Sequence, residues 1–440
     1  MESLTYDSIN NQIIKTLEPP SRKYWALVGL LIIGVLIGAA AWVYQIAIGM
    51  GVAGVSHPVN WGVYLVNFVF WVGIAHSGTL ISAFLFLMRA SWRTSIARSA
   101  EAITVFALIV AGMYPLVHLG RVWIFYWLIP YPNQRQLWPN FQSPLMFDVV
   151  AINTYLIISV MFWFTGLIPD FAVVRDRARG VRRWIYGMLS LGWSGSHHQW
   201  RHYRNSYIFF AAMIAAVVVS VHSVVSWDFA LSILPGWHAT IFPPYFVSGA
   251  IHSGLALVLF FLVPTRRLIN LKEIIRPGDF ENVTKLMIVT GMILGYSYVT
   301  EIFAAWYSGN PLEWEIFRYR MFGPFAWVFY PMFVFNVIVP MLFFFKKFRT
   351  DERLIMICSF LIVAGMWLER YVIIISSLSH DFIPHAWGPY FPSLVEICIT
   401  VGSFCLFSLC FVFFVRFIPP VSINEVKEHI PPPLRNSNHG

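Results

Sequence analysis

The run YWALVGLLIIGVLIGAAAWVYQIAI, residues 24–48, contains no charged side chain. A helix rises about 1.5 Å per residue, so about 20 apolar residues are enough to cross the hydrocarbon core of a bilayer. A stretch of this length and polarity is therefore typical of a membrane-spanning helix.

The rest of the chain repeats this pattern. Of its 440 residues, 58% are hydrophobic and only 12% are charged, and the mean hydropathy is +0.66. We therefore expect an all-α integral membrane protein with ten transmembrane helices. The predicted spans are residues 24–48, 59–88, 98–129, 144–168, 206–231, 243–264, 282–308, 322–345, 354–376 and 391–416.

The basic residues predict how the chain is oriented. Most of the 30 Lys and Arg residues lie in alternate connections that share one side of the membrane. The opposite connections contain only Arg121, Arg135, Arg318 and Arg320. The positive-inside rule then predicts a cytoplasmic N-terminal segment, residues 1–23, and a Pro-rich cytoplasmic tail, residues 417–440. These cations face anionic lipid, so the net charge does not indicate nucleic-acid binding.

A short internal repeat predicts how the spans are grouped. Residues 73–81 read GIAHSGTLI and residues 249–257 read GAIHSGLAL, each at the same place in an even-numbered span. Two parallel four-helix bundles follow, spans 2–5 within 59–231 and spans 6–9 within 243–376. Spans 24–48 and 391–416 are then peripheral, and all spans are expected to be continuous helices.

Ionisable residues gather near the outer face of the first bundle. His118, Arg121, Asp148 and Asp228 are predicted at one depth on three consecutive spans, with His118 and Arg121 on one helix face. Charge inside a membrane is costly and indicates a site. A hydroquinone loses two protons with its two electrons; His118 can accept one, and the acids can accept or relay the other. Arg121 is expected to pair with an acid; a purely structural Arg–Asp pair is the alternative.

The histidines do not have the spacing of haem ligands. One histidine lies in each of spans 2, 3, 5 and 6, namely His76, His118, His222 and His252, so no span carries two. We therefore expect no haem and no metal in this chain. His76 and His252 are expected to form interhelical hydrogen bonds.

A second histidine group lies in the basic segment 169–205. His197, His198 and His202 have no acidic or Cys companion there. This segment is interpreted as a solvated loop that faces lipid, without a metal site.

The ordered motifs GIAHSGTLISA, GMYPLVHLGRVW, SPLMFD, VHSVVSWDFA and LERYVII resemble the NrfD/PsrC family of quinone-interacting membrane subunits. Within it, the set is most similar to the ActC membrane protein of bacterial alternative complex III. The resemblance implies two four-helix bundles in a bacterial inner membrane. It also implies a quinol site near the outer face, with menaquinol favoured over ubiquinol.

Carried over to this sequence, the family's quinol-site histidine is His118 and its acids are Asp148 and Asp228. Tyr114 and His222 complete the expected quinol-binding set with Arg121. The resemblance further implies that electrons pass to a periplasmic iron–sulfur subunit and then to multihaem cytochrome c subunits. A paralogous NrfD-like membrane subunit is a further expected partner, and the loops 130–143 and 377–392 are candidate docking surfaces.

The second bundle contains its own ionisable residues. Glu369, Arg370 and Glu301 are predicted in the outer halves of spans 9 and 7, and His252 lies in span 6. They are either a buried Glu–Arg pair that fixes helix register or part of a proton path.

The sequence therefore predicts a quinol-oxidising subunit of a respiratory or photosynthetic electron-transfer complex, active only within that complex. A multi-span ion or solute transporter is the alternative, since transporters also combine repeats with buried charge.

The charge asymmetry makes a prediction about topology. Cysteines introduced at residues 135 and 180 should react with a membrane-impermeant reagent from opposite sides of the membrane, residue 180 from the cytoplasmic side. Labelling of both positions from the same side would contradict the orientation.

Overall fold

The structure is a computed structural model that describes residues 5–18, 20–128 and 144–428. The predicted loop 130–143 and Arg135 lie outside this part of the chain. Ten helices within it are long and apolar enough to cross a membrane, and every regular element is helical. The prediction of an all-α protein with ten transmembrane helices is confirmed.

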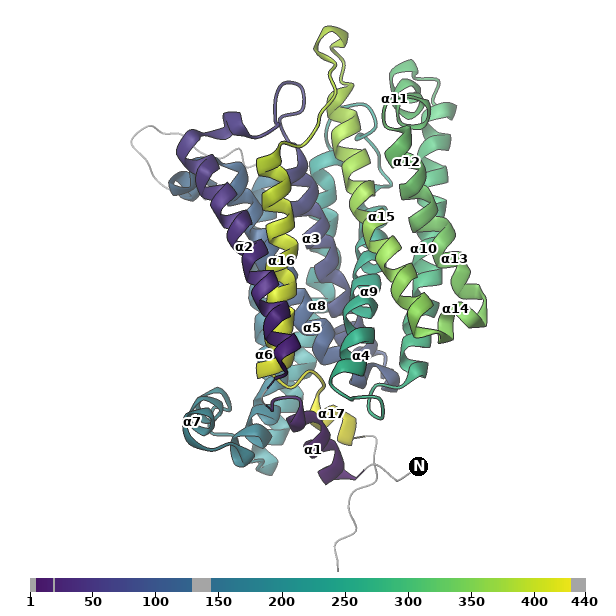
Figure 1. Cartoon of the computed structure of the whole chain (residues 1–440). Coiled ribbons are helices and arrows are strands. Elements are labelled where there is room, and N and C mark those ends of the chain that lie inside the picture. The colour runs from purple at the N-terminus through teal and green to yellow at the C-terminus, as the bar shows by residue number, and fades with distance from the viewer. Residues whose placement is uncertain (1–4, 19, 129–143, 429–440) are drawn as a thin grey trace, which may run out of the picture.

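The spans run from one end of the molecule to the other (Figure 1). In chain order they are α2 (Arg22–Ile48), α3 (Val63–Thr79) with η2 (Leu80–Phe84) and α4 (Leu85–Leu87), α5 (Ala97–His118), α6 (Pro144–Arg177), α8 (His197–Ala230), α9 (Phe242–Leu268), α10 (Pro277–Tyr307), α12 (Ala326–Phe333) with η5 (Val334–Ile338), α13 (Val339–Met341) and η6 (Leu342–Phe344), α15 (Glu352–Ser379) and α16 (Leu394–Phe417).

Short helices connect the spans. They are α1 (Tyr6–Lys15), η1 (Met50–Val52), η3 (Ser91–Ser95), η4 (Val122–Leu128), α7 (Gly180–Leu189), α11 (Pro311–Phe322), α14 (Lys346–Thr350), η7 (Pro384–Ala386) and α17 (Ile423–Lys427).

Consecutive spans pack into a continuous body. Helix α3 packs on α5, α5 on α6 and α6 on α8, while α9 packs on both α10 and α15, and α12 on α15. The two groups meet where α9 packs against α3 and α8. Helices α2 and α16 lie side by side along one flank (Figure 1), where α16 also contacts α5. The repeat symmetry of two bundles stays a prediction.

The α2–α16 contact depends on small residues. A Cβ atom on Gly38 would lie 2.7 Å from the Cα atom of Gly402, so neither position accepts a larger side chain without moving the helices apart. Such contacts are typical of helix pairs in membranes, where dispersion replaces the hydrophobic effect as the main attraction.

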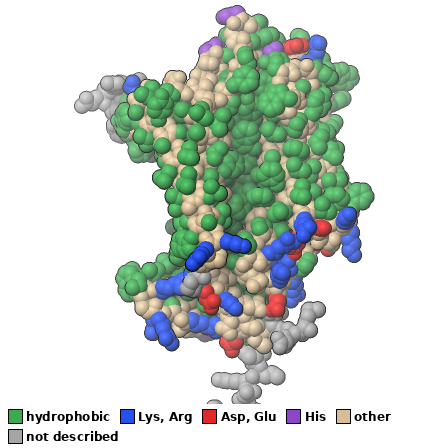
Figure 2. Space-filling model, in the orientation of Figure 1, with side chains coloured by type: hydrophobic (Ala, Val, Ile, Leu, Met, Phe, Trp, Pro, Cys, Tyr) green, Lys and Arg blue, Asp and Glu red, His purple; other side chains and the backbone are tan. Residues whose placement is uncertain are grey.

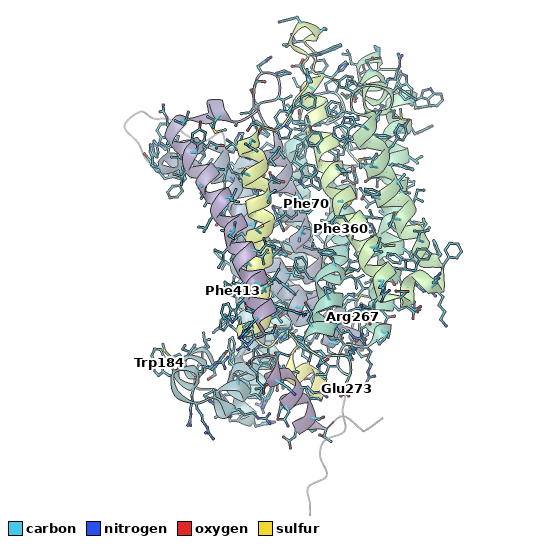
Figure 3. The ribbon with its side chains drawn as sticks, viewed as in Figure 1. Phe70, Trp184, Arg267, Glu273, Phe360 and Phe413 are labelled. Carbon is cyan, nitrogen blue, oxygen red and sulfur yellow. The ribbon has the colours of Figure 1, made fainter. Side chains whose placement is uncertain are left out.

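The two ends of the molecule differ in charge. Figure 2 shows an apolar belt between them and most of the visible Lys and Arg side chains at the lower end. We call this the basic end; it contains α1, α7, α14 and α17, and Arg267 and Glu273 lie there in Figure 3. We call the other the cation-poor end; it contains η1, η4, α11 and η7.

The structure contradicts the prediction of a loop at residues 169–205. Helix α6 continues to Arg177 and α8 begins at His197, so most of segment 169–205 is helical. Outside a bilayer, hydropathy no longer reports where a helix ends. His197, His198 and His202 are exposed on the first turns of α8, with 3.0 Å between the Nε2 atoms of His198 and His202.

Two spans are not continuous α-helices. Span 2 contains the π-turn η2 and span 8 contains the π-turn η5. A π-turn adds one residue to a helical turn and changes the direction of the side chains around it, often at functional sites.

The C-terminal segment is not simply an extended tail. Residues 418–427 fold back against the basic end, where Val421 and Ile423 are fully buried. Glu425 of α17 forms an ion pair of 3.0 Å with Arg93, and the Ser99 hydroxyl donates to the Pro420 carbonyl at 2.8 Å.

A buried ion network lies beneath this segment. The guanidinium of Arg98 lies 2.9 Å from Glu101 and 3.2 Å from Asp170, and it donates to Ser422 at 3.2 Å. None of the three charged side chains is more than 3% exposed. Arg98 therefore connects α5, α6 and the C-terminal segment through groups that have no access to water.

This network predicts a stability effect. Arg98→Ala leaves two buried carboxylates without their cation and should cost about 3–5 kcal/mol, because breaking a buried pair exposes the full desolvation penalty. The thermal unfolding midpoint of the purified chain measures this loss. Arg353→Ala, which removes an exposed arginine at the same end, should change stability by no more than about 0.5 kcal/mol. Equal midpoints for the two variants would contradict the structural role of Arg98.

Candidate functional site

The outer part of the predicted site begins where α5 ends. The helix stops at His118 because Gly120 adopts a φ of +65°, a left-handed conformation that glycine accepts without strain. A Cβ atom there would also lie 2.7 Å from the Met50 side chain. Arg121 follows this turn and is not on the helix, so the prediction that His118 and Arg121 share a helix face is wrong.

Arg121 does not join the acids either. Its side chain is exposed, and within the described residues it forms no ion pair. The expected pairing with Asp148 or Asp228 is therefore absent from the structure.

The structure brings Asp148 and Asp228 together. Asp148 lies one turn into α6 and Asp228 lies in the last turn of α8, and these helices pack against each other. The two carboxyl groups lie close enough for the protonation of one to affect the other. All four carboxyl oxygens are buried, and none has a hydrogen-bond donor among the described residues. Across the same ranges, no cation forms an ion pair with either acid.

His118 lies near a third acid. Its Nδ1 atom is buried without a hydrogen-bond partner, and its ring packs edge-on near Trp61 with 6.5 Å between ring centroids. The charged group that acts on it is the carboxylate of Glu396 at the start of α16. Within the described residues, no hydrogen bond joins His118 to Asp148 or Asp228.

Glu396 was missed by the sequence analysis. Its carboxylate is fully buried and accepts hydrogen bonds of 2.8 Å each from the Gly54 amide, the Tyr390 hydroxyl and the Ser393 amide. It is the only acid in the predicted span 391–416, and that was the available signal. The three donors explain how a buried carboxylate is stabilised at this position.

Tyr114 belongs to a polar chain that connects the same helices. Its hydroxyl donates to Ser403 of α16 at 2.8 Å. Gln45 of α2 was also missed: it accepts a hydrogen bond from Tyr64 and donates to the Val117 carbonyl at 2.9 Å. These bonds fix α2 and α16 against the half of α5 that lies at the cation-poor end, next to His118.

A narrow apolar cavity of about 130 Å³ lies between α2, α5 and α16. Tyr114 and Val117 line it from α5, about one turn or less from His118. Its other lining residues are Val35, Gly38, Ala39, Trp42, Val110, Met113, Ile399, Gly402, Ser403 and Leu406. The cavity therefore extends inward from the neighbourhood of His118 along lipid-facing helices.

His222 lies apart from the acids in the structure. It is fully buried against His76, with 4.4 Å between the ring centroids, and neither ring nitrogen of His222 has a partner among the described residues. The Nε2 atom of His76 lies 2.8 Å from the Val218 carbonyl of α8. The Nδ1 atom of His252 lies 2.7 Å from the Thr290 hydroxyl of α10. The interhelical hydrogen bonds predicted for His76 and His252 are confirmed.

Glu369 and Glu301, the predicted acids of the second group of spans, belong to two separate ion pairs. Glu369 lies 2.8 Å from Arg370 and accepts hydrogen bonds from Tyr298 and from Asn336, the latter at 3.3 Å. Asn336 reaches this carboxylate from the π-turn η5. All of these side chains are buried.

Glu301 has a different partner. It lies 3.3 Å from Arg320 of α11, a residue that the sequence predicts in a connection between spans. Arg320 is buried and also donates to Ser376 and Ser377 of α15 at 2.8 Å and 2.9 Å. Among the described residues, no hydrogen bond connects His252 to Glu301 or Glu369.

Within the described ranges, no group of three or more His, Cys, Asp or Glu side chains is arranged to hold a metal ion. The unpaired polar atoms instead suit an organic molecule with hydroxyl groups. The Asp148–Asp228 pair can accept a hydrogen bond or a proton, since two neighbouring carboxylates repel each other when both are ionised. His118 can accept a second proton.

Comparisons with known proteins agree with this description of the chain. The family model described as polysulphide reductase, NrfD, matches residues 51–380. The chain is 25% identical over 418 residues to a putative membrane subunit of dimethyl sulfoxide reductase from Halobacterium salinarum, with 89% of this chain and 90% of that protein aligned. It is 21% identical over 434 residues to the Hdr-like menaquinol oxidoreductase integral membrane subunit of Archaeoglobus fulgidus, with 94% and 98% aligned.

The matched region begins between α2 and α3 and reaches the end of α15. It therefore includes His118, Asp148 and Asp228 together with the spans that position them, as well as the Glu369–Arg370 pair. With three quarters of its length matched by the family model, the chain belongs to the NrfD family of membrane proteins.

Proposed function

We propose that this chain is the quinol-oxidising membrane subunit of an electron-transfer complex. The observation that supports this most directly is the set of buried, unpaired proton acceptors at the cation-poor end: the Nδ1 atom of His118 and the four carboxyl oxygens of Asp148 and Asp228. Burying polar atoms without partners is costly, so such a set is expected where a ligand supplies the missing hydrogen bonds.

A hydroquinone matches this set chemically. Its two hydroxyl groups donate hydrogen bonds, and its oxidation to a quinone releases two protons and two electrons. In the proposed reaction His118 accepts one proton. The Asp148–Asp228 pair accepts the second proton and passes protons to the aqueous side at the cation-poor end. Glu396 stabilises the imidazolium form of His118 by its negative charge.

The apolar cavity between α2, α5 and α16 suits the isoprenoid tail of such a quinol. It is lined almost entirely by apolar side chains and begins close to His118. A quinol with its ring near His118 would thus keep its tail in an apolar environment that faces lipid. The name of the Archaeoglobus relative, a menaquinol oxidoreductase subunit, favours menaquinol over ubiquinol.

The electrons need an acceptor, since no redox group is proposed for this chain. We propose that they leave to an iron–sulfur subunit bound at the cation-poor end and then pass to multihaem cytochrome c subunits. The docking surface would include the segment after α15, where Phe391, Phe382 and Trp387 are exposed by 72%, 45% and 41%. A paralogous NrfD-like membrane subunit is a further proposed partner, as in alternative complex III, which the sequence motifs resemble.

The proposed orientation follows the charge asymmetry. The basic end would face the cytoplasm and carry both termini, and the quinol site would open toward the periplasm of a bacterial inner membrane. Protons released by quinol oxidation would then be deposited on the periplasmic side.

The proposed site makes a prediction about activity. His118→Ala and Asp228→Asn should each lower the rate of quinol oxidation by the assembled complex by about 10²-fold, because each removes a proton acceptor. Steady-state turnover with a menaquinol analogue measures this. Glu315→Gln, which alters an exposed acid at the same end, is the control and should keep wild-type turnover. If either variant retains wild-type turnover in an intact complex, the residue that it changes is not a proton acceptor in quinol oxidation.

We also propose that the Glu369 group is part of a proton path through the second group of spans. Glu369, Tyr298 and Asn336 form a connected set of exchangeable groups, as a path requires. Glu301 and His252 would extend it only through water or movement, because the structure pairs them with Arg320 and Thr290.

This path predicts a separation of two activities. Glu369→Gln should leave uncoupled quinol oxidation nearly unchanged, since no hydrogen bond or ion pair among the described residues joins Glu369 to His118, Asp148 or Asp228. It should lower proton release per electron when the complex turns over in sealed vesicles. An unchanged ratio of protons to electrons, or failure of the variant to assemble, would indicate that Glu369 and Arg370 form only a structural pair.

A further inference from the structure

A separate surface feature lies at the basic end, on the short helix α7 that joins α6 to α8. Its exposed apolar residues are Val181, Trp184, Ile185 and Met188, at 73%, 66%, 43% and 59% exposure. They are spaced i, i+3, i+4 and i+7, so they lie on one face of the helix. An amphipathic helix with such a face is typical of segments that lie in a membrane interface.

The opposite face of α7 fixes its depth. The buried Tyr186 donates a hydrogen bond of 2.7 Å to the carbonyl of Phe417, the last residue of α16. Arg182 donates at 3.0 Å to the carbonyl of Leu17, shortly before α2 begins at Arg22. Both contacts lie where spans leave the apolar belt. Helix α7 is therefore held at the level of the membrane surface, and Trp184 projects at the edge of the molecule in Figure 3.

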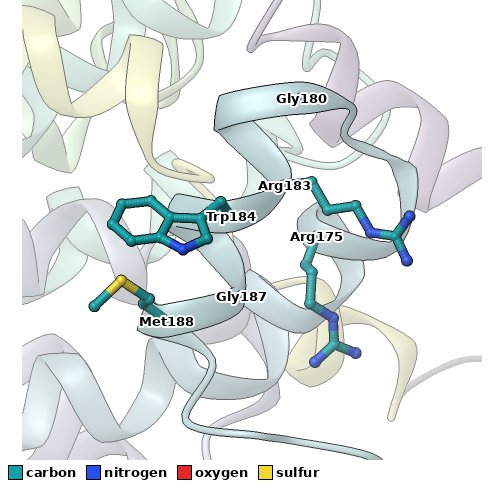
Figure 4. Close-up of a pocket in the computed structure, with 6 residues that line it drawn as sticks. All are labelled: Arg175, Gly180, Arg183, Trp184, Gly187 and Met188. Atoms are coloured by element: carbon teal, nitrogen blue, oxygen red, sulfur yellow. The ribbon is translucent and has the colours of Figure 1, made fainter.

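A hollow lies between α7 and the end of α6. It is lined by Arg175, Gly180, Arg183, Trp184, Gly187 and Met188. In Figure 4 the two guanidinium groups lie on one side of Gly187 and the side chains of Trp184 and Met188 on the other. The hollow thus places positive charge next to an apolar surface.

The glycines keep the hollow open. The nearest atom to a Cβ placed on Gly187 is the Arg175 Cδ atom at 3.8 Å, and a Cβ on Gly180 would meet nothing within 4 Å. Arg175 is held in position by Ser190 and by the Trp193 carbonyl, at 3.2 Å and 3.0 Å.

The charges here are only partly balanced by the protein, where Arg177 pairs with Asp7 at 3.6 Å. Arg175 pairs with the exposed Asp176 at 2.8 Å. Arg183 is exposed and forms no ion pair within the described part of the chain. Further arginines nearby are Arg177, Arg179 and Arg182. An anionic group would complement this set, and guanidinium groups bind phosphate oxygens in a planar, bidentate geometry.

We propose that this hollow binds one anionic glycerophospholipid of the membrane leaflet at the basic end. Arg183 and Arg175 would bind the phosphate, and the acyl chains would run along Met188, Trp184 and the rest of the exposed stripe. A membrane lipid is favoured over a protein partner for two reasons. The stripe is held where the spans leave the apolar belt, and α6, the span that leads to α7, exposes apolar residues such as Val160 and Met161, by 40% and 49%.

The experiment compares lipids bound to the purified full-length chain. The chain is loaded with equal amounts of phosphatidylglycerol and phosphatidylcholine of the same acyl composition, and bound lipids are counted by native mass spectrometry. Wild type should retain phosphatidylglycerol preferentially. Arg183→Gln should weaken this retention about fivefold, the effect of one basic residue at a charged membrane surface. Gly187→Leu, which fills the hollow without changing charge, should reduce it similarly.

Two controls make the result specific. Arg353→Gln removes an exposed cation at the basic end but on α15, and it should leave the preference unchanged. Inorganic phosphate at millimolar concentration should not displace the lipid, because the acyl contacts contribute to binding.

Three outcomes would overturn the proposal. Equal retention of phosphatidylglycerol by wild type, Arg183→Gln and Gly187→Leu would show that the hollow is not a lipid site. The exposed apolar stripe of α7 would then be assigned to a contact with another protein. A loss in Arg353→Gln as large as in Arg183→Gln would indicate only diffuse charge attraction. Displacement by inorganic phosphate would identify a simple anion site. The variants are expected to fold, since Arg183 is exposed and the Gly187 position is open, and unfolding midpoints would verify this.

Discussion

Hydrocarbon does not solvate charge, and this constraint determines where nearly every ionisable side chain of the spans lies. Arg98 is buried between Glu101 and Asp170, Arg370 lies beside Glu369, and Arg320 lies beside Glu301. Glu396, which pairs with no cation within the described ranges, is held by three hydrogen-bond donors instead. Against this pattern Asp148 and Asp228 differ, because they have neither a cation nor a donor among the described residues. Among the described residues, the other buried acids of this pattern have a cation or a donor while these two have neither, which is expected where function rather than stability determines the side chains.

Hydropathy predicts the spans of this chain well because ten uninterrupted apolar runs are difficult to explain in any other way. It predicts the helix ends poorly. The apolar residues 122–128 continue the hydropathy signal of span 3, yet the backbone has already turned at Gly120 and forms the 3₁₀ helix η4. At the basic end the helices are instead longer than the apolar runs, because α6 and α8 continue as regular helices into polar sequence. Backbone conformation and burial, not composition, determine these ends.

The candidate site illustrates the same limit. Once the topology is chosen, the position of a residue in the sequence determines its depth in the membrane. This predicted depth was enough to place His118, Asp148 and Asp228 at the same end of the molecule. It does not fix the direction in which a side chain points around its helix axis. His118 therefore lies in the field of Glu396, a residue of the last span, and His222 lies against His76. The partner of Glu301 was also hidden, because Arg320 enters the membrane region from a connecting helix.

The contact between the two groups of spans limits how they can influence each other. His222 is the innermost ionisable group of α8, and its ring lies 5.9 Å from that of Phe246 on α9. The guanidinium of Arg370 lies 4.2 Å from the centroid of the same Phe246 ring. An aromatic ring does not transfer protons, and within the described residues no hydrogen bond links His222 to Arg370. A cation on a ring face is nevertheless attracted by it, and charges separated by low-dielectric material interact strongly. A protonation change near His222 would therefore act on the Glu369–Arg370 pair through its electric field at this contact.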